Sequence, residues 1–132
     1  MKKHKQALLH SKAYEFAHSI NGNILGLKYP IVIIPQVSKK FAANLNGLYI
    51  GETFEGSTIH EIHFSVWHNL TDELLFDTIA HELCHALQIE TGNYSLYLPH
   101  DDFFFKMLNN ILTGSGLPEV DQDYIDLMRS ED

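Results

Sequence analysis

The residues His81-Glu82-Leu83-Cys84-His85 form the pattern HExxH, which places two imidazoles and one carboxylate in one short stretch of chain. On a helix, residues four apart lie one turn apart along the axis and about 40° apart around it. His81 and His85 can therefore both reach one metal ion. Glu82 projects to the side, where its carboxylate can reach a water on that ion. This combination is typical of metal-dependent hydrolysis.

A catalytic zinc ion needs a third protein ligand and leaves its fourth position to water. A closely spaced third histidine would stand at position 91, where the chain has Thr91, and Glu90 projects toward the apolar face of the helix. His100 lies far enough along the chain for a turn, at the start of a further expected helix. We therefore predict His100 as the third ligand, with Asp101 and Asp102 as the alternatives.

The residues around this motif predict a helix over residues 71–90. Thr71 is a favourable N-cap, acidic residues follow it in the first turn, and Gly92 is a favourable stop. The apolar residues of this stretch gather on the arc opposite His81 and His85. One face of the helix is therefore expected to pack against a core while the other carries the ligands.

Three β-rich segments precede the motif helix, and their short connections predict an antiparallel meander. In the last of them Ile62 and Phe64 alternate with Glu61 and His63, which predicts one buried face and one face in solvent. The expected strands cover residues 29–37, 48–50 and 58–66, and the other expected helices cover residues 5–20, about 100–114 and 118–128. We therefore expect one α+β domain over residues 1–132, with an N-terminal helix, a three-stranded antiparallel sheet and several later helices.

The chain has 132 residues, 45% of them hydrophobic, which suits a single domain with a buried core. No apolar stretch is long enough for a membrane span. The basic start is not followed by the apolar segment of a signal peptide, so we expect a cytoplasmic protein. The single cysteine, Cys84, excludes internal disulfides and an all-cysteine zinc site, and it is expected to be a buried, inert thiol.

A net charge of −8 argues against general affinity for nucleic acid. The basic residues are nevertheless concentrated, since seven lysines lie within residues 1–40 and most acids lie within residues 41–132. A basic N-terminal face could contact phosphate, although solvated lysines are the simpler interpretation. DNA is therefore kept as a partner to test.

The spacing of the three histidines and the residues around them resemble the SprT-like zinc metallopeptidases, the group that includes Spartan. Fourteen residues separate His85 from His100. The other residues that carry the resemblance are Ala86, Leu87, an aromatic residue at Phe103 or Phe104, and Lys106. The resemblance covers roughly residues 5–113, so the chain reads as a single SprT-like metallopeptidase domain.

This resemblance implies a small zincin-like fold in which His81, His85 and His100 hold Zn²⁺ and Glu82 is the general acid and base of peptide hydrolysis. It implies a protein or peptide substrate, which in several members is a protein crosslinked or bound to DNA. Two features depart from the family. Asp101 stands where many members have glycine, and the cysteine-rich zinc ribbon that many members add is missing. The second departure argues against DNA-linked targeting.

Further expectations concern the surroundings of the site. Tyr94 and Tyr97 are candidates for stabilising the oxyanion, and Asp77 is a candidate acceptor for an imidazole N–H. An extended peptide is expected to pair with the sheet edge. Two other functions stay open: a metal-stabilised protein- or nucleic-acid-binding module without proteolytic activity, and a zinc hydrolase whose substrate is not a peptide. The intact Glu82 favours an enzyme, because a purely structural site has no use for it.

Overall fold

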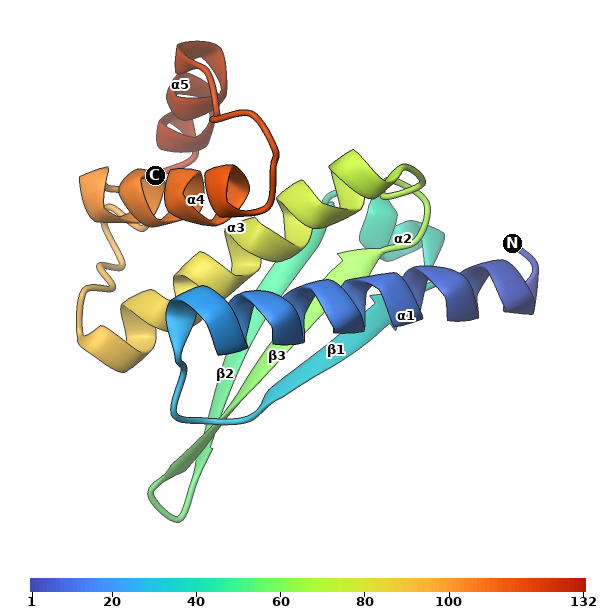
Figure 1. The fold of residues 1–132 in the computed structure, drawn as a ribbon, viewed down its shortest axis with the longest axis horizontal. Helices are drawn as coiled ribbons and strands as arrows, with labels where there is room; N and C mark the ends of the chain where they lie inside the picture. The colour runs from blue at the N-terminus through green and yellow to red at the C-terminus, as the bar shows by residue number, and fades with distance from the viewer.

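The protein is built on a three-stranded sheet in the order β1-β3-β2 (Figure 1). A computed structural model describes all of residues 1–132. The strands are β1 Ile31–Gln36, β2 Gly47–Phe54 and β3 Ser57–Ser65. The helices are α1 Lys3–Ile20, α2 Lys39–Ala42, α3 Asp72–Thr91, α4 Asp102–Gly114 and α5 Gln122–Ser130, with a π-helical turn, η1 Asn21–Leu25, directly after α1. These elements confirm the expected α+β class.

The sheet is mixed, which corrects the antiparallel meander predicted from the sequence. β3 pairs in parallel with β1 and antiparallel with β2, so β3 is the central strand and β2 is an edge strand. Residues 37–46, which include α2, lead from β1 to the far side of β3. Two strand spacings amount to only about 10 Å, a distance that this segment covers easily. The length of the connection therefore does not reveal which strands are neighbours.

A tight turn at Glu55 and Gly56 joins β2 to β3. Both residues have positive φ, 51° and 80°, as a type I′ turn requires, and the twist of this turn fits a two-residue hairpin. β2 therefore continues to Phe54, which lies opposite Ser57, whereas the expected strand ended at residue 50. The result is a longer edge strand than the sequence predicted.

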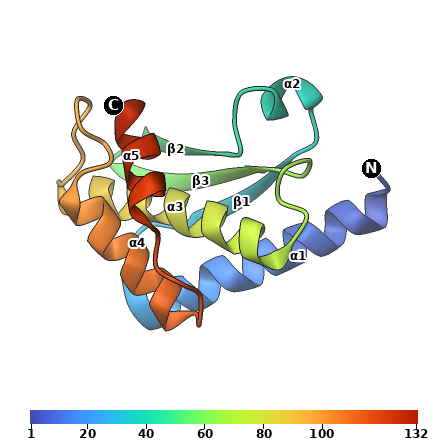
Figure 2. The same ribbon diagram turned by 90° about the horizontal axis from the view of Figure 1, so that it is seen from above.

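Helices α1 and α3 cover the same face of the sheet, as two perpendicular views show (Figures 1 and 2). Apolar side chains from both helices and from β3 form one core. Its members include Leu9, Ala13, Ala17 and Ile20 of α1, Ile62 and Phe64 of β3, and Leu75, Ile79 and Leu83 of α3. Each large aliphatic side chain buried here stabilises the fold by about 1.5–3 kcal/mol. This core holds α3 against the sheet, so residues on the opposite face of α3 have defined positions.

The second face of β3 is buried at its C-terminal end, although the sequence pattern predicted a face in solvent. His63 is 8% exposed and Ser65 is fully buried. Gln36 Nε2 on β1 lies 2.8 Å from His63 Nδ1, and Glu61 Oε1 lies 3.0 Å from His63 Nε2. Gln36 from the neighbouring strand and Glu61 from β3 itself surround the His63 ring, so the polarity of this residue does not indicate exposure.

A polar network joins the C-terminal end of α3 to the sheet. His60 is fully buried, with its Nε2 2.6 Å from Glu90 Oε2 and its Nδ1 2.7 Å from Tyr49 Oη. The backbone N–H groups of Lys28 and Tyr29 donate to the same carboxylate. Burial by itself raises the pKa of Glu90, but the hydrogen bonds from Lys28, His60 and Tyr29 outweigh it, so this pKa is lowered.

Replacing Glu90 with glutamine is expected to destabilise the fold by about 1–3 kcal/mol at pH 7, because charge-assisted hydrogen bonds are lost. Since the pKa of Glu90 is lower in the folded chain than in the unfolded one, its contribution is complete above about pH 4.3. The contribution disappears as the pH falls through the folded pKa. Urea unfolding at pH 7 and at pH 3 measures how much Glu90→Gln lowers the free energy of unfolding at each pH, with the exposed Glu15→Gln as control. An equal difference at both pH values would contradict this role of Glu90.

Helix α4 packs against α3 through buried side chains that include Phe104, Leu108 and Ile111, and α5 lies beyond it at the outer side of the molecule (Figure 1). The boundaries of α4 agree with the helix expected from about residue 100. The last helix, α5, begins four residues later than expected, since Asp121 caps it by accepting a hydrogen bond from Tyr124 N–H. No helix in the structure combines the length and apolar character that a membrane crossing requires.

Candidate metal centre

Helix α3 carries the HExxH motif in its central turns. The helix begins where the Thr71 side chain accepts a hydrogen bond from Leu74 N–H and ends at Gly92, which has a φ of 72°. Both boundary signals predicted from the sequence are confirmed. Cys84 on the core side is 1% exposed, and burial raises the pKa of its thiol, which fits the expected inert cysteine. His81 and His85 lie on the other side of the helix, away from that core.

The chain reverses after Gly92 and brings His100 back to the motif helix. Asp101 then begins α4 as its N-cap, accepting a hydrogen bond from Phe104 N–H at 2.9 Å. Asp102 pairs with Arg129 at 2.6 Å. The two acids that rivalled His100 as third ligand are therefore occupied elsewhere, while His100 itself is 8% exposed and faces the motif.

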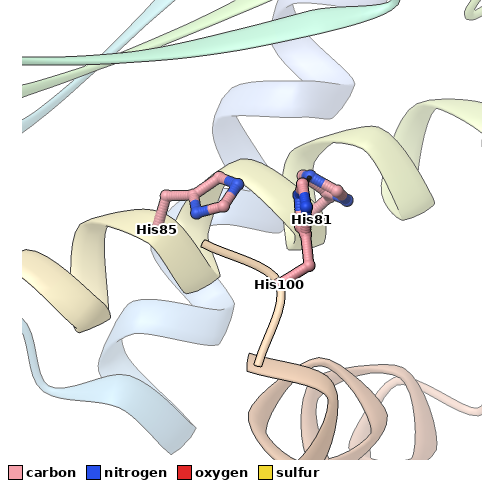
Figure 3. Close-up of side chains that lie close together, drawn as sticks. All are labelled: His81, His85 and His100. Carbon is pink, nitrogen blue, oxygen red and sulfur yellow. Dashed lines mark hydrogen bonds between the residues drawn. The ribbon is translucent and has the colours of Figure 1, made fainter. Parts of the chain in front are cut away.

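His81, His85 and His100 converge on one point (Figure 3). One nitrogen from each ring lies within 4.8 Å of the other two. The Nε2 atoms of His81 and His100 are 3.2 Å apart. Nitrogens that bind one zinc ion tetrahedrally at 2.0–2.1 Å stand about 3.3 Å from one another. The three rings therefore need only small rotations to hold one metal ion.

Each imidazole has a hydrogen-bond partner at its Nδ1. The partner of His81 is Tyr124 Oη at 2.7 Å, that of His85 is Gln88 Oε1 at 2.7 Å, and that of His100 is Asp132 Oδ1 at 2.8 Å. When Nδ1 carries the ring proton and donates it to such a partner, Nε2 presents its lone pair. With the ring protons at Nδ1, the Nε2 atoms of all three rings are free to bind a metal ion, and those of His81 and His100 lie 3.2 Å apart.

The site is hydrophobic beneath the three rings. Phe104 is fully buried, and the centroid of its ring lies 4.8–4.9 Å from the centroids of all three imidazoles. Desolvation by burial lowers the pKa of His81 well below its usual value and that of His85 to about 4, and nearby imidazoles add to both shifts. Both rings are therefore neutral at pH 7, the form that binds a metal ion.

No family model, curated protein or solved structure matches this chain.

Glu82 lies beside the three histidines with no partner for one of its oxygens. It is 6% exposed, its Oε1 is 3.9 Å from His81 Nε2, and its Oε2 has no hydrogen bond. Burial raises the pKa of this carboxyl group to about 8. An ionisable group buried without a partner costs free energy, and a cation bound at the adjacent histidines offsets this cost by favouring the charged form.

A cleft of about 430 Å³ opens beside Glu82 between the start of β2, α3 and α5. Gly47, the first residue of β2, approaches α3 so closely that a Cβ there would lie 2.6 Å from Thr78 Cγ2 and 3.3 Å from Glu82 Cγ. Glycine is therefore required for this approach of strand to helix. The remaining lining residues include Leu45, Leu74, Asp77, Tyr124, Met128 and Glu131. The sheet edge thus leads directly to the carboxylate.

The other residues singled out in the sequence lie apart from the converging nitrogens. Tyr97 is 86% exposed, and the Tyr94 ring centroid is 6.3 Å from that of His85. Asp77 lines the cleft, and its pKa is raised by burial and, to a smaller extent, by the nearby charge of Glu73. The hydrogen-bond partner of His81 Nδ1 is Tyr124 and not Asp77, the candidate named from the sequence. Sequence reasoning missed the three Nδ1 partners. Only Gln88 had a local signal, because it stands three residues after His85 on the same helix face.

Proposed function

We propose that the protein is a zinc-dependent endopeptidase of the SprT-like type. The observation that carries this proposal is the set of three converging imidazoles beside a buried, unpartnered Glu82 at the end of a cleft. Three neutral histidines are a donor set that zinc favours, and three protein ligands leave one coordination position for water. His81, His85 and His100 are the proposed ligands.

A binding module with a structural metal site is a less suitable explanation. Structural zinc sites are usually closed by four protein ligands, whereas three histidines converge here. Such a module also gains nothing from burying Glu82, whose Oε2 has no partner and whose charged form burial disfavours. A general base is a role that explains both the position and the missing partner of this carboxylate.

The chemistry divides between the metal and Glu82. Zinc, when bound, supplies a Lewis acid that polarises a peptide carbonyl and lowers the pKa of water to about 7. The Glu82 carboxylate accepts the proton of the attacking water and then donates it to the leaving amine. The Nδ1 partners of the three histidines keep their rings oriented, and Phe104 keeps bulk water from beneath the site.

The proposed substrate is an extended polypeptide segment that pairs with β2. An edge strand has unpaired backbone N–H and C=O groups on its outer side, and an extended peptide can add to them as a further strand. β2 is such an edge, and its first residue, Gly47, lines the cleft beside Glu82. The cleft has no lysine or arginine in its lining, so we do not extend the proposal to DNA-bound substrates.

The test is hydrolysis of an unstructured protein such as casein by protein that has been loaded with one equivalent of zinc. We expect cleavage that a chelator abolishes and that added zinc restores, because the three imidazoles alone supply no Lewis acid. Fragments identified by mass spectrometry would show internal peptide bonds as the targets. Zinc binding without hydrolysis of any polypeptide would contradict the endopeptidase proposal and favour the binding module.

A further inference from the structure

Helix α5 is held to the protein by few apolar contacts. None of its residues is buried, and it follows α4 at the outer side of the molecule (Figure 1). Tyr124, Ile125 and Met128 are only partly buried against the core. Yet Tyr124 and Met128 also line the cleft beside Glu82. A helix with so little buried surface therefore forms one wall of the proposed active site.

Besides the ion pair between Arg129 and Asp102, polar contacts of this region go to two of the three proposed ligands. Tyr124 Oη lies 2.7 Å from His81 Nδ1, and Asp132 Oδ1 lies 2.8 Å from His100 Nδ1. The Asp132 side chain is only 4% exposed. Arg129 Nε donates to the carbonyl oxygen of His100 at 3.3 Å. The segment 122–132 thus contacts both sides of the ligand set, whereas His85 has its partner on α3.

We propose that Tyr124 and Asp132 are positioning residues through which the docking of α5 and the binding of zinc stabilise each other. A metal ion at Nε2 requires the ring proton at Nδ1, where these two side chains accept it, and it strengthens that N–H as a donor. The accepting carboxylate in turn makes His100 a better ligand. Zinc loading would therefore fix the wall of the cleft as well as the reactive centre. This inference depends on the metal site of the proposed function.

The coupling has a quantitative consequence. By linkage, the factor by which zinc stabilises the docked α5 equals the factor by which the docked α5 tightens zinc binding. Loss of partners of this kind weakens metal binding by about 10–100-fold. A helix that merely packs against α4 would show neither effect, since its contacts would be the same with and without the metal.

The first experiment measures the zinc Kd of Asp132→Asn and Tyr124→Phe, both close in shape to the original residues, by competition with a chromogenic chelator. We expect the Kd to rise about 10–100-fold for each. The control is Asp126→Asn, because Asp126 is exposed on the same helix and its side chain accepts a hydrogen bond from Gln122 rather than from a proposed ligand. Circular dichroism of the metal-free variants monitors the fold. A Kd equal to that of the control in both variants would overturn the proposal.

The second experiment measures hydrogen exchange of the α5 amides by mass spectrometry, with and without zinc. We expect zinc to slow this exchange about 10–100-fold in the wild-type chain, and much less in the variant carrying both substitutions. Equal slowing in the two proteins would overturn the coupling. If the wild-type chain binds no zinc, both this inference and the proposed function are wrong. If the affinities change as expected but no polypeptide is cleaved, only the endopeptidase proposal is wrong.

Discussion

Zinc-loaded protein carrying Glu82→Gln is expected to lose peptide hydrolysis by about 10²–10⁴-fold, the usual contribution of a general acid–base group. Glutamine has nearly the same shape as glutamate, but its amide does not accept the proton of the attacking water. Glu82 Oε1 lies 3.9 Å from His81 Nε2, but the group of donor atoms that lie within 4.8 Å of one another consists of the three histidines without this carboxylate, so we place Glu82 beside the metal rather than among its ligands. Zinc content is therefore expected to stay at one equivalent.

Cleavage of a fluorogenic peptide at saturating zinc measures this effect, with metal content determined on the same samples. The matched control is Glu73→Gln, which changes an exposed acid in the first turn of the same helix and is expected to keep full activity. Equal cleavage by wild type and Glu82→Gln would show that Glu82 is not the general base. Loss of zinc together with activity would instead make Glu82 a ligand.

The parts of the structure that the sequence predicted are those encoded within a few turns of chain. Thr71 and Gly92 define the ends of α3 because caps act on neighbouring backbone groups. The placement of His81 and His85 on the side opposite the core follows from helical periodicity alone. His100 needed one further assumption, that the chain after Gly92 folds back, and its Nε2 does lie 3.2 Å from that of His81.

The parts that the sequence did not predict depend on contacts between distant segments. The order of the strands depends on how residues 37–46 pass the sheet, and no local pattern records that path. The alternating pattern of β3 predicts that His63 faces solvent, but His63 is buried. Such a pattern does not show which side chains of other segments cover the strand. Tyr124 and Asp132 reach the ligands from 43 and 32 residues away along the chain. Their roles emerged only from the structure.

Replacing His100 with alanine is expected to weaken zinc binding by about 10²–10³-fold. Structural zinc sites with four ligands bind with about 10–16 kcal/mol, or roughly 2.5–4 kcal/mol for each ligand. The loss is larger than the one expected for Asp132→Asn, because it removes the ligand rather than its orientation. The exposed His18→Ala on α1 is the control. One equivalent of zinc bound with unchanged Kd in His100→Ala would show that the third ligand lies elsewhere.

Combining His100→Ala with Asp132→Asn separates the ligand from the residue that positions it. If Asp132 acts on zinc mainly through the His100 ring, the double variant is expected to bind zinc nearly as His100→Ala does. Only a small further loss is expected, because the backbone N–H of residue 100 still donates to Asp132 Oδ2 and helps to hold α5 and Tyr124. The two effects would be additive if Asp132 contacted the metal itself. Additive losses would therefore show that Asp132 is a ligand, and four protein ligands would bring the centre closer to a closed structural site. Non-additive losses would leave three protein ligands and one coordination position for the water that Glu82 deprotonates.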